Sequence, residues 1–241
     1  MNPRSVGEAI KLARGVSSGI WDQKKVTIVL APPFLYTQVI SEPIKKSSIK
    51  LGAQNVFWEK AGAYTGEISA EQLKSSGAAF VILGHSERRA LGETNSEVRN
   101  KLKAVVRSGM KAILCVGEKE KRHDEAFPRM VKEELTEALS KIKKQFFKNI
   151  ILAYEPIWAI GTGQHDTPED VFEMSILIRK EILKLVGKKW AFRIPILYGG
   201  SVDEKNAADF IKNGRVDGLL VGGASLNAKK FVKIVEAVSH S

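Results

Sequence analysis

The sequence predicts an α/β fold with parallel strands, because short β-branched runs alternate with longer amphipathic stretches along the whole chain. Seven runs have the character of strands, eight stretches have the character of helices, and every helix except the first follows a strand. We therefore expect a (β/α)8-type barrel whose first β-strand is missing. We expect one domain over residues 1–241, a length at which such barrels commonly form a single core.

The expected elements follow one another with turn signals between them and without a low-complexity linker. The strands are apolar runs of four to six residues, at 26–31, 49–54, 80–83, 111–116, 150–154, 193–198 and 217–221. The helices are the longer amphipathic stretches, at 3–18, 34–46, 70–76, 94–108, 125–147, 168–186, 203–213 and 228–238. The order is therefore one helix followed by seven strand–helix units.

Composition limits the compartment and the partners. The single cysteine, Cys115, suits a reducing cytosol, and neither a signal peptide nor a membrane-length apolar run is present, so we expect a cytoplasmic protein. The net charge of +11 is compatible with nucleic acid, a membrane surface or anionic small molecules. The lysines at 141–148 and 180–189 are spread along helical segments without the aromatic-interleaved or glycine-rich signature of a nucleic-acid site, so we expect solvated helix faces and neither nucleic-acid nor membrane partners.

One carboxylate follows an apolar strand and precedes a proline-hinged apolar segment. Glu155 is the first acid after the strand at 150–154, Pro156 stiffens the turn, and Gly161 and Gly163 loosen the far end. Exclusion of water raises the basicity of a carboxylate and protects a carbanion-like intermediate. The arrangement favours proton abstraction in a closed site, and an ordinary buried turn is the alternative.

Polar or glycine-rich residues also follow three other strands, at the end of the barrel where active sites are built. His85 lies on a turn that opens into a helical or polar segment, and a helix N-terminus there would favour the neutral imidazole. A structural histidine bonded to the backbone is the alternative. Gly199–Gly200 and Gly222–Gly223 leave backbone N–H groups open to an anion, which indicates a phosphate site; a tight turn explains either pair taken alone.

Four motifs occur in the order and approximate spacing of the triosephosphate isomerase family, which the chain resembles over essentially its whole length: GHSERR at 84–89, YEPIWAIGTG at 154–163, YGGSV at 198–202 and LVGGASL at 220–226. The resemblance implies a TIM barrel. It also implies interconversion of dihydroxyacetone phosphate and glyceraldehyde 3-phosphate through an enediol or enediolate, with a small phosphorylated triose as substrate and neither metal nor organic cofactor.

The resemblance carries over residue by residue. It implies that Glu155 is the catalytic base and His85 the neutral group that polarises the carbonyl, with Ser86 and Glu87 in the same supporting motif and Glu87 ordering the polar network behind the site. The phosphate would be held at Gly161, Ser201, Gly222 and Gly223. The closing lid would comprise Pro156, Ile157, Trp158, Ala159, Ile160, Gly161 and Thr162.

The chain departs from the family at its N-terminus. The family opens with a Gly-Asn-Trp-Lys-Met-Asn type of strand whose asparagine and lysine enter the site, whereas this sequence starts at the equivalent methionine, Met1. Losing one preorganised donor costs about 2.7–4 kcal/mol of transition-state stabilisation, so activity much below the family's is expected.

The loop at 57–68 resembles the family's dimer loop, which implies a homo-oligomer, as a dimer or an altered assembly. A phosphate-ligand-binding or assembly barrel, and a reading frame that starts upstream, remain alternatives.

Overall fold

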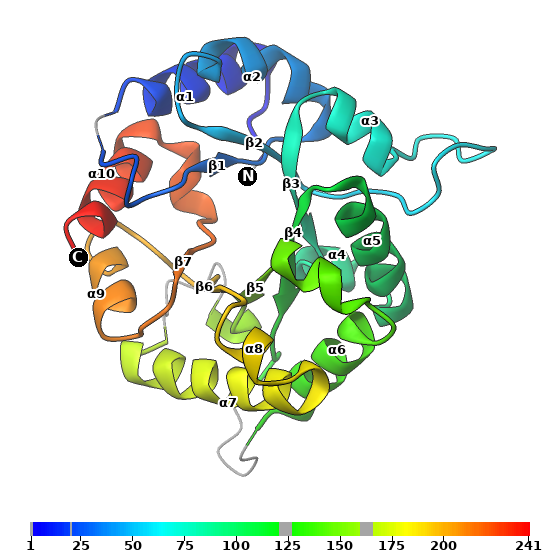
Figure 1. Cartoon of the computed structure of the whole chain (residues 1–241). Coiled ribbons are helices and arrows are strands. Elements are labelled where there is room, and N and C mark those ends of the chain that lie inside the picture. The colour runs from blue at the N-terminus through cyan, green and yellow to red at the C-terminus, as the bar shows by residue number, and fades with distance from the viewer. Residues whose placement is uncertain (1, 20, 121–126, 160–165) are drawn as a thin grey trace.

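The computed structural model describes residues 2–19, 21–120, 127–159 and 166–241. Within them a seven-stranded sheet, in the order β1 to β7, curls into an incomplete ring with the helices outside it (Figure 1). All six strand pairings are parallel. The strands are β1 (Val29–Leu30), β2 (Lys50–Ala53), β3 (Ala78–Leu83), β4 (Lys111–Val116), β5 (Ile150–Tyr154), β6 (Ile196–Tyr198) and β7 (Gly218–Leu219).

Ten α-helices and four 3-10 helices lie in the described residues. The α-helices are α1 (Val6–Ser17), α2 (Thr37–Ile44), α3 (Ala70–Ser75), α4 (Ser86–Ala90), α5 (Asn95–Ser108), α6 (Arg129–Leu139), α7 (Pro168–Val186), α8 (Lys188–Ala191), α9 (Ala207–Lys212) and α10 (Ala228–Ser239). The 3-10 helices are η1 (Phe34–Tyr36), η2 (Lys144–Asn149), η3 (Ile157–Ala159) and η4 (Gly223–Leu226). None of the helices described is both long and apolar enough to cross a membrane.

The structure confirms a seven-stranded parallel α/β sheet, and each of the eight predicted helical stretches contains an α-helix, while two further short α-helices are present in the described residues. The short helices α4 and α8 were not predicted, because five and four residues are too few to show helical periodicity. The helix expected over 125–147 ends instead at Leu139, where Lys141 takes a positive φ of 61° and the chain continues as η2. Residues 125 and 126 lie outside the described part.

The central strands are buried on both faces. In β4, Ala112 and Leu114 face the helix layer and pack with α5, whereas Ile113 and Cys115 belong to a second cluster inside the ring, with Phe80. The alternation arises because successive side chains of a strand point to opposite faces. Parallel strands covered on both faces are apolar throughout, as β4 is.

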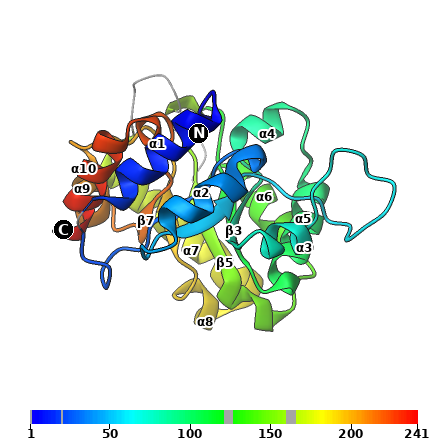
Figure 2. The same ribbon diagram turned by 90° about the horizontal axis from the view of Figure 1, so that it is seen from above.

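Within the part of the chain that the structure describes, the sheet does not close: β1 pairs with β2 alone, and β7 with β6 alone. The helix layer nevertheless continues past this place, because α1 packs against both α2 and α10 (Figures 1 and 2). Between the outer edges of β1 and β7 lies an apolar cavity of about 470 Å³. We call this region, edges and cavity together, the open seam.

Candidate active site

A second cavity, of about 890 Å³, opens where the strands end at their carboxyl termini. Its wall includes His85 after β3, Gly199 to Ser201 after β6, and Gly222 with Gly223 after β7. Three of the predicted strand ends therefore meet at one cleft. This is the end of a parallel barrel at which active sites are built.

The N-cap position of α4 holds His85. Its Nδ1 accepts a hydrogen bond from the backbone N–H of Glu87 at 3.2 Å. An Nδ1 that accepts leaves the proton of a neutral imidazole on Nε2, so Nε2 is the donor in that tautomer. The backbone N–H groups at the start of α4 also disfavour positive charge on the ring. The predicted helix N-terminus at His85 is thus present in the structure.

The carboxylate of Glu155 lies directly behind this imidazole. The residue is 1% exposed, its backbone N–H donates to the Val116 carbonyl at 2.8 Å, and its Oε2 accepts from the Ser86 backbone N–H at 2.9 Å. Its Oε1 lies 3.2 Å from His85 Nε2, but the contact lacks hydrogen-bond geometry. Among the described residues Oε1 therefore has no hydrogen-bond partner. A buried, unsatisfied carboxylate oxygen is costly, and such groups often mark functional sites.

Two glycines make room for the backbone and side chain of Glu155. A Cβ on Gly117 would lie 1.8 Å from the Glu155 carbonyl oxygen, and one on Gly199 would lie 3.0 Å from its Cγ. Gly199 also donates its backbone N–H to Tyr154 at 2.8 Å. Strands β4 and β6 therefore approach β5 closely at their ends, which fixes where the carboxylate stands.

A buried ion pair connects the turn that carries His85 with the glycine that abuts Glu155. Arg89 Nε donates to the Gly84 carbonyl at 2.8 Å and lies 3.3 Å from Glu134 Oε1, and Glu134 Oε2 accepts from the Gly117 N–H at 3.0 Å. Burial raises the pKa of Glu134 to about 7 although Arg89 opposes the shift. We call Arg89 with Glu134 the brace.

The brace replaces a role that the resemblance gave to Glu87. The side chain of Glu87 is 75% exposed and its Oε2 lies 3.8 Å from His85 Nδ1, so it does not order the network behind the site. Sequence analysis missed Glu134, although its position offered a signal: it lies on the buried side of α6 with Val131, Leu135 and Ala138, where a charged residue is unusual.

The first part of the predicted lid is anchored at its base. Trp158, in η3, donates its Nε1–H to Glu118 Oε1 at 3.0 Å, and the Tyr154 hydroxyl donates to the same oxygen at 2.7 Å. The Ile157 N–H donates to the Glu118 carbonyl at 2.9 Å, and Pro156 and Ala159 are buried. Burial raises the pKa of Glu118 to about 7. The predicted lid residues Ile160, Gly161 and Thr162, and Gly163, lie outside the described residues.

The glycine-rich ends after β6 and β7 both line the cleft. Ser201, Gly222 and Gly223 are in its wall, and a Cβ at either Gly222 or Gly223 would meet no atom within 4 Å. These glycines are therefore not required by packing against the described residues, and their backbone is open to the cleft. Helix η4 starts directly at Gly223, whereas α9 starts only at Ala207, six residues after Ser201.

The curled parallel sheet, with a histidine–glutamate pair at its carboxyl rim, places the protein among the α/β barrels with a rim active site. The chain belongs to the triosephosphate isomerase family, whose sequence pattern matches residues 1–238. A triosephosphate isomerase of Dictyoglomus thermophilum is 42% identical over 234 residues, which are 96% of this chain and 91% of the relative. Those of Caldanaerobacter subterraneus subsp. tengcongensis and Endomicrobium trichonymphae are 42% and 39% identical, over 96% and 97% of this chain and 94% of each relative.

Proposed function

We propose that the protein is an intramolecular isomerase that interconverts dihydroxyacetone phosphate and D-glyceraldehyde 3-phosphate. The observation that carries the proposal is the approach of His85 Nε2 to Glu155 Oε1, 3.2 Å apart beside the cleft. Membership of the family supports the same reaction. It requires only proton movement, for which a base and a neutral donor are sufficient.

In the proposed mechanism, Glu155 removes a proton from the carbon next to the substrate carbonyl and returns it to the neighbouring carbon. His85 gives its Nε2 proton to the oxygen that becomes negative and takes back the proton of the neighbouring hydroxyl, so the carbonyl moves by one carbon and the imidazole returns to its neutral form. No atom is gained or lost. Because Oε1 and Nε2 are only 3.2 Å apart, the carboxylate must move away from the ring to admit a carbon atom between them. The hydrogen bond that Glu155 Oε2 accepts from the Ser86 N–H would be exchanged in that movement.

The phosphate would be held by the backbone N–H groups of Gly161, Ser201, Gly222 and Gly223. Three of these four residues line the cleft, and the net charge of +11 favours an anion. The segment from Pro156 to Thr162 would close over the bound substrate. Closure would exclude water from the enediolate, whose breakdown would otherwise compete with isomerisation.

We further propose that residues 1–241 by themselves turn over slowly. The open seam lies where the resemblance places the family's first strand, whose lysine would supply a cation to the site. Asn2 lines the cleft and Pro3 lines the cavity of the seam, so residues joined before them would start at this rim. One missing donor costs about 2.7–4 kcal/mol, or roughly a hundred- to a thousandfold in rate. The open sheet also favours a second function, an impaired barrel that binds a phosphorylated ligand.

A homo-oligomer in the cytoplasm completes the proposal. The segment between β2 and α3 projects from the barrel (Figure 2), and in it the ring of Phe57 packs at a tilt against those of Trp58 and Tyr64, at centroid distances of 4.2 and 4.7 Å. Projecting aromatic side chains of this kind suit contact with a second copy. Sedimentation of the protein, compared with that of Tyr64→Ser, tests the assembly.

Turnover of glyceraldehyde 3-phosphate tests the activity. Residues 1–241, the Glu155→Ala variant, and a version extended by Gly-Asn-Trp-Lys are compared, and binding of dihydroxyacetone phosphate is measured by calorimetry. We expect slow turnover by residues 1–241, loss of it in Glu155→Ala, and at least a hundredfold gain on extension. Binding without turnover in every version would favour the ligand-binding barrel. Unchanged turnover in Glu155→Ala would exclude the proposed base.

A further inference from the structure

We propose that the end of the barrel opposite the cleft binds single-stranded nucleic acid, through two basic segments that the fold brings side by side. The segment 140–149 leads into β5 and the segment 187–195 leads into β6, so both lie at the amino ends of parallel strands. Figure 2 shows α8, part of the second segment, at the end of the molecule opposite α4. We call the cations of both segments, together with Phe192, the basic rim. These cations are all exposed: Lys141, Lys143, Lys144, Lys148, Lys188, Lys189 and Arg193.

The two segments form one surface because their strands are neighbours. Strand β5 pairs with β6, and the Leu152 N–H donates to the Pro195 carbonyl at 2.9 Å. The rings of Phe147 and Trp190, one from each segment, lie 5.7 Å apart between their centroids. The sequence predicts solvated helix faces for these lysines, but α6 ends at Leu139 and the lysines that follow it lie in a turn and in the short η2. Two runs that are far apart in the chain therefore add their charges at one place.

The charge of the basic rim is not neutralised by acids. Its two segments contain seven Lys or Arg and no Asp or Glu, in a chain whose net charge is +11. Within the described residues none of the seven forms an ion pair. Glu181 and Asp217, in adjoining elements, are already paired with Lys184 and Arg179. Uncompensated like charges repel one another, and an anionic partner removes that repulsion.

The exposed ring of Phe192 selects among anionic partners. This side chain is 71% exposed, whereas the other three aromatic side chains of the two segments are buried or half-buried. A lipid surface is held by several apolar side chains that reach beyond the cations, and the basic rim has one. One ring is sufficient to stack one unpaired base while neighbouring cations contact the phosphates. Lys189 and Arg193 flank Phe192 in the chain, which suits this arrangement.

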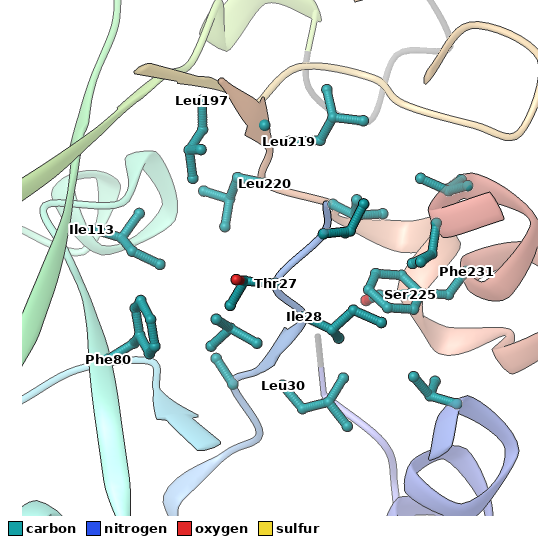
Figure 3. A pocket seen from close by; sticks show the side chains of 18 of the residues that line it. Thr27, Ile28, Leu30, Phe80, Ile113, Leu197, Leu219, Leu220, Ser225 and Phe231 are labelled. Atoms are coloured by element: carbon teal, nitrogen blue, oxygen red, sulfur yellow. The ribbon is translucent and has the colours of Figure 1, made fainter. Parts of the chain in front are cut away.

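The basic rim is separate from the site of the proposed isomerisation. None of its cations lines the cleft, and none lines the cavity of the open seam (Figure 3). Nucleic acid bound at this end would therefore leave the cleft open to a small substrate. The surface adds a binding function to the proposed enzyme and does not depend on its activity.

The salt dependence of binding tests the cations. A fluorescein-labelled oligouridylate of about 15 nucleotides is titrated with the protein between about 50 and 200 mM salt, and fluorescence anisotropy is measured. The logarithm of affinity should fall against the logarithm of salt with a slope of about −3 to −5, near −0.7 for each cation in contact.

Three pairs of adjacent exposed lysines are then changed to glutamine, two in the basic rim and one at the start of α10 as the control: Lys143→Gln with Lys144→Gln, Lys188→Gln with Lys189→Gln, and Lys229→Gln with Lys230→Gln. Each pair in the rim should weaken binding roughly tenfold and reduce the slope by about 1.4. The control pair removes the same charge from the other end of the barrel and should change neither.

Two variants of Phe192 test the ring separately. Phe192→Leu keeps an apolar side chain but removes the flat ring, and should weaken oligouridylate binding about 5- to 150-fold without changing the slope. Phe192→Trp keeps a ring and should bind at least as tightly as the parent. Phosphatidylserine vesicles and polyglutamate of the same charge as the oligouridylate serve as the competing anionic partners.

The proposal is overturned if the control pair weakens binding as much as the pairs in the rim, or if Phe192→Leu binds oligouridylate as tightly as the parent. Binding to the vesicles without binding to oligouridylate would assign the rim to a membrane surface instead. Equal affinity for polyglutamate would assign it to an acidic polypeptide. None of these measurements uses turnover, so their failure leaves the proposed activity unaffected.

Discussion

A methyl group at position 117 has no space in this protein. It would lie 1.8 Å from the carbonyl oxygen of Glu155, an atom of the backbone that cannot turn aside as a side chain could. Gly117→Ala should therefore displace Glu155 from His85 and lower kcat about a hundredfold, since an error of about 1 Å has that effect. Gly7→Ala is the control, because the nearest atom to a Cβ there is Ser5 Oγ at 3.9 Å. Parental turnover in Gly117→Ala would show that the close approach does not position the base.

The carboxyl of Glu134 makes stability depend on pH. Its folded-state pKa of about 7 lies above the unfolded value near 4.5 because burial disfavours the charge, so the folded state binds more protons between these values. The free energy of unfolding should fall by about 3 kcal/mol from this group as pH rises from 4.5 to 7. Glu134→Gln should reduce that fall in denaturant unfolding. Glu133→Gln, its half-exposed neighbour, should not, and equal slopes in both variants would contradict the expectation.

At the scale of single elements, the bounds of a strand could be predicted best where the strand is paired on both sides. Strands β4 and β5 have the predicted bounds, 111–116 and 150–154, because each is paired on both sides and buried on both faces. Strands β1 and β7 keep two residues each of the predicted 26–31 and 217–221, because a ladder exists on one side only. The residues around Glu155 and His85 could be predicted from motifs. The brace could be predicted only in part: the apolar neighbours of Glu134 on α6 indicate that it is buried, but its partner Arg89 is known only once α6 is placed against the sheet.

The base of the lid depends on one buried acceptor. Glu118 Oε1 receives both the Tyr154 hydroxyl and the Trp158 indole N–H, while Oε2 has no hydrogen bond among the described residues. Tyr154→Phe should cost about 1.5–3 kcal/mol in free energy of unfolding at pH 8, the range for a hydrogen bond to a charged group. The loss should shrink at pH 5, because the raised pKa of about 7 leaves Glu118 neutral there. Tyr64→Phe, at a 44% exposed position, is the control, and a loss independent of pH would refute the argument.

At the scale of the whole molecule, the charge of +11 should draw an anionic substrate toward the cleft. The Debye length shortens from about 30 Å at 0.01 M salt to about 10 Å at 0.1 M, so this attraction is screened over that range. We expect kcat/KM for glyceraldehyde 3-phosphate to fall about tenfold, with kcat nearly unchanged, because screening acts on encounter and binding and not on proton transfer between buried groups. Unphosphorylated glyceraldehyde, which carries no charge, is the matched substrate and should show no dependence on salt. An equal dependence for both substrates would mean that salt acts on the protein itself, and no dependence for either would mean that the excess lysines are too dispersed over the helix faces to guide the phosphate.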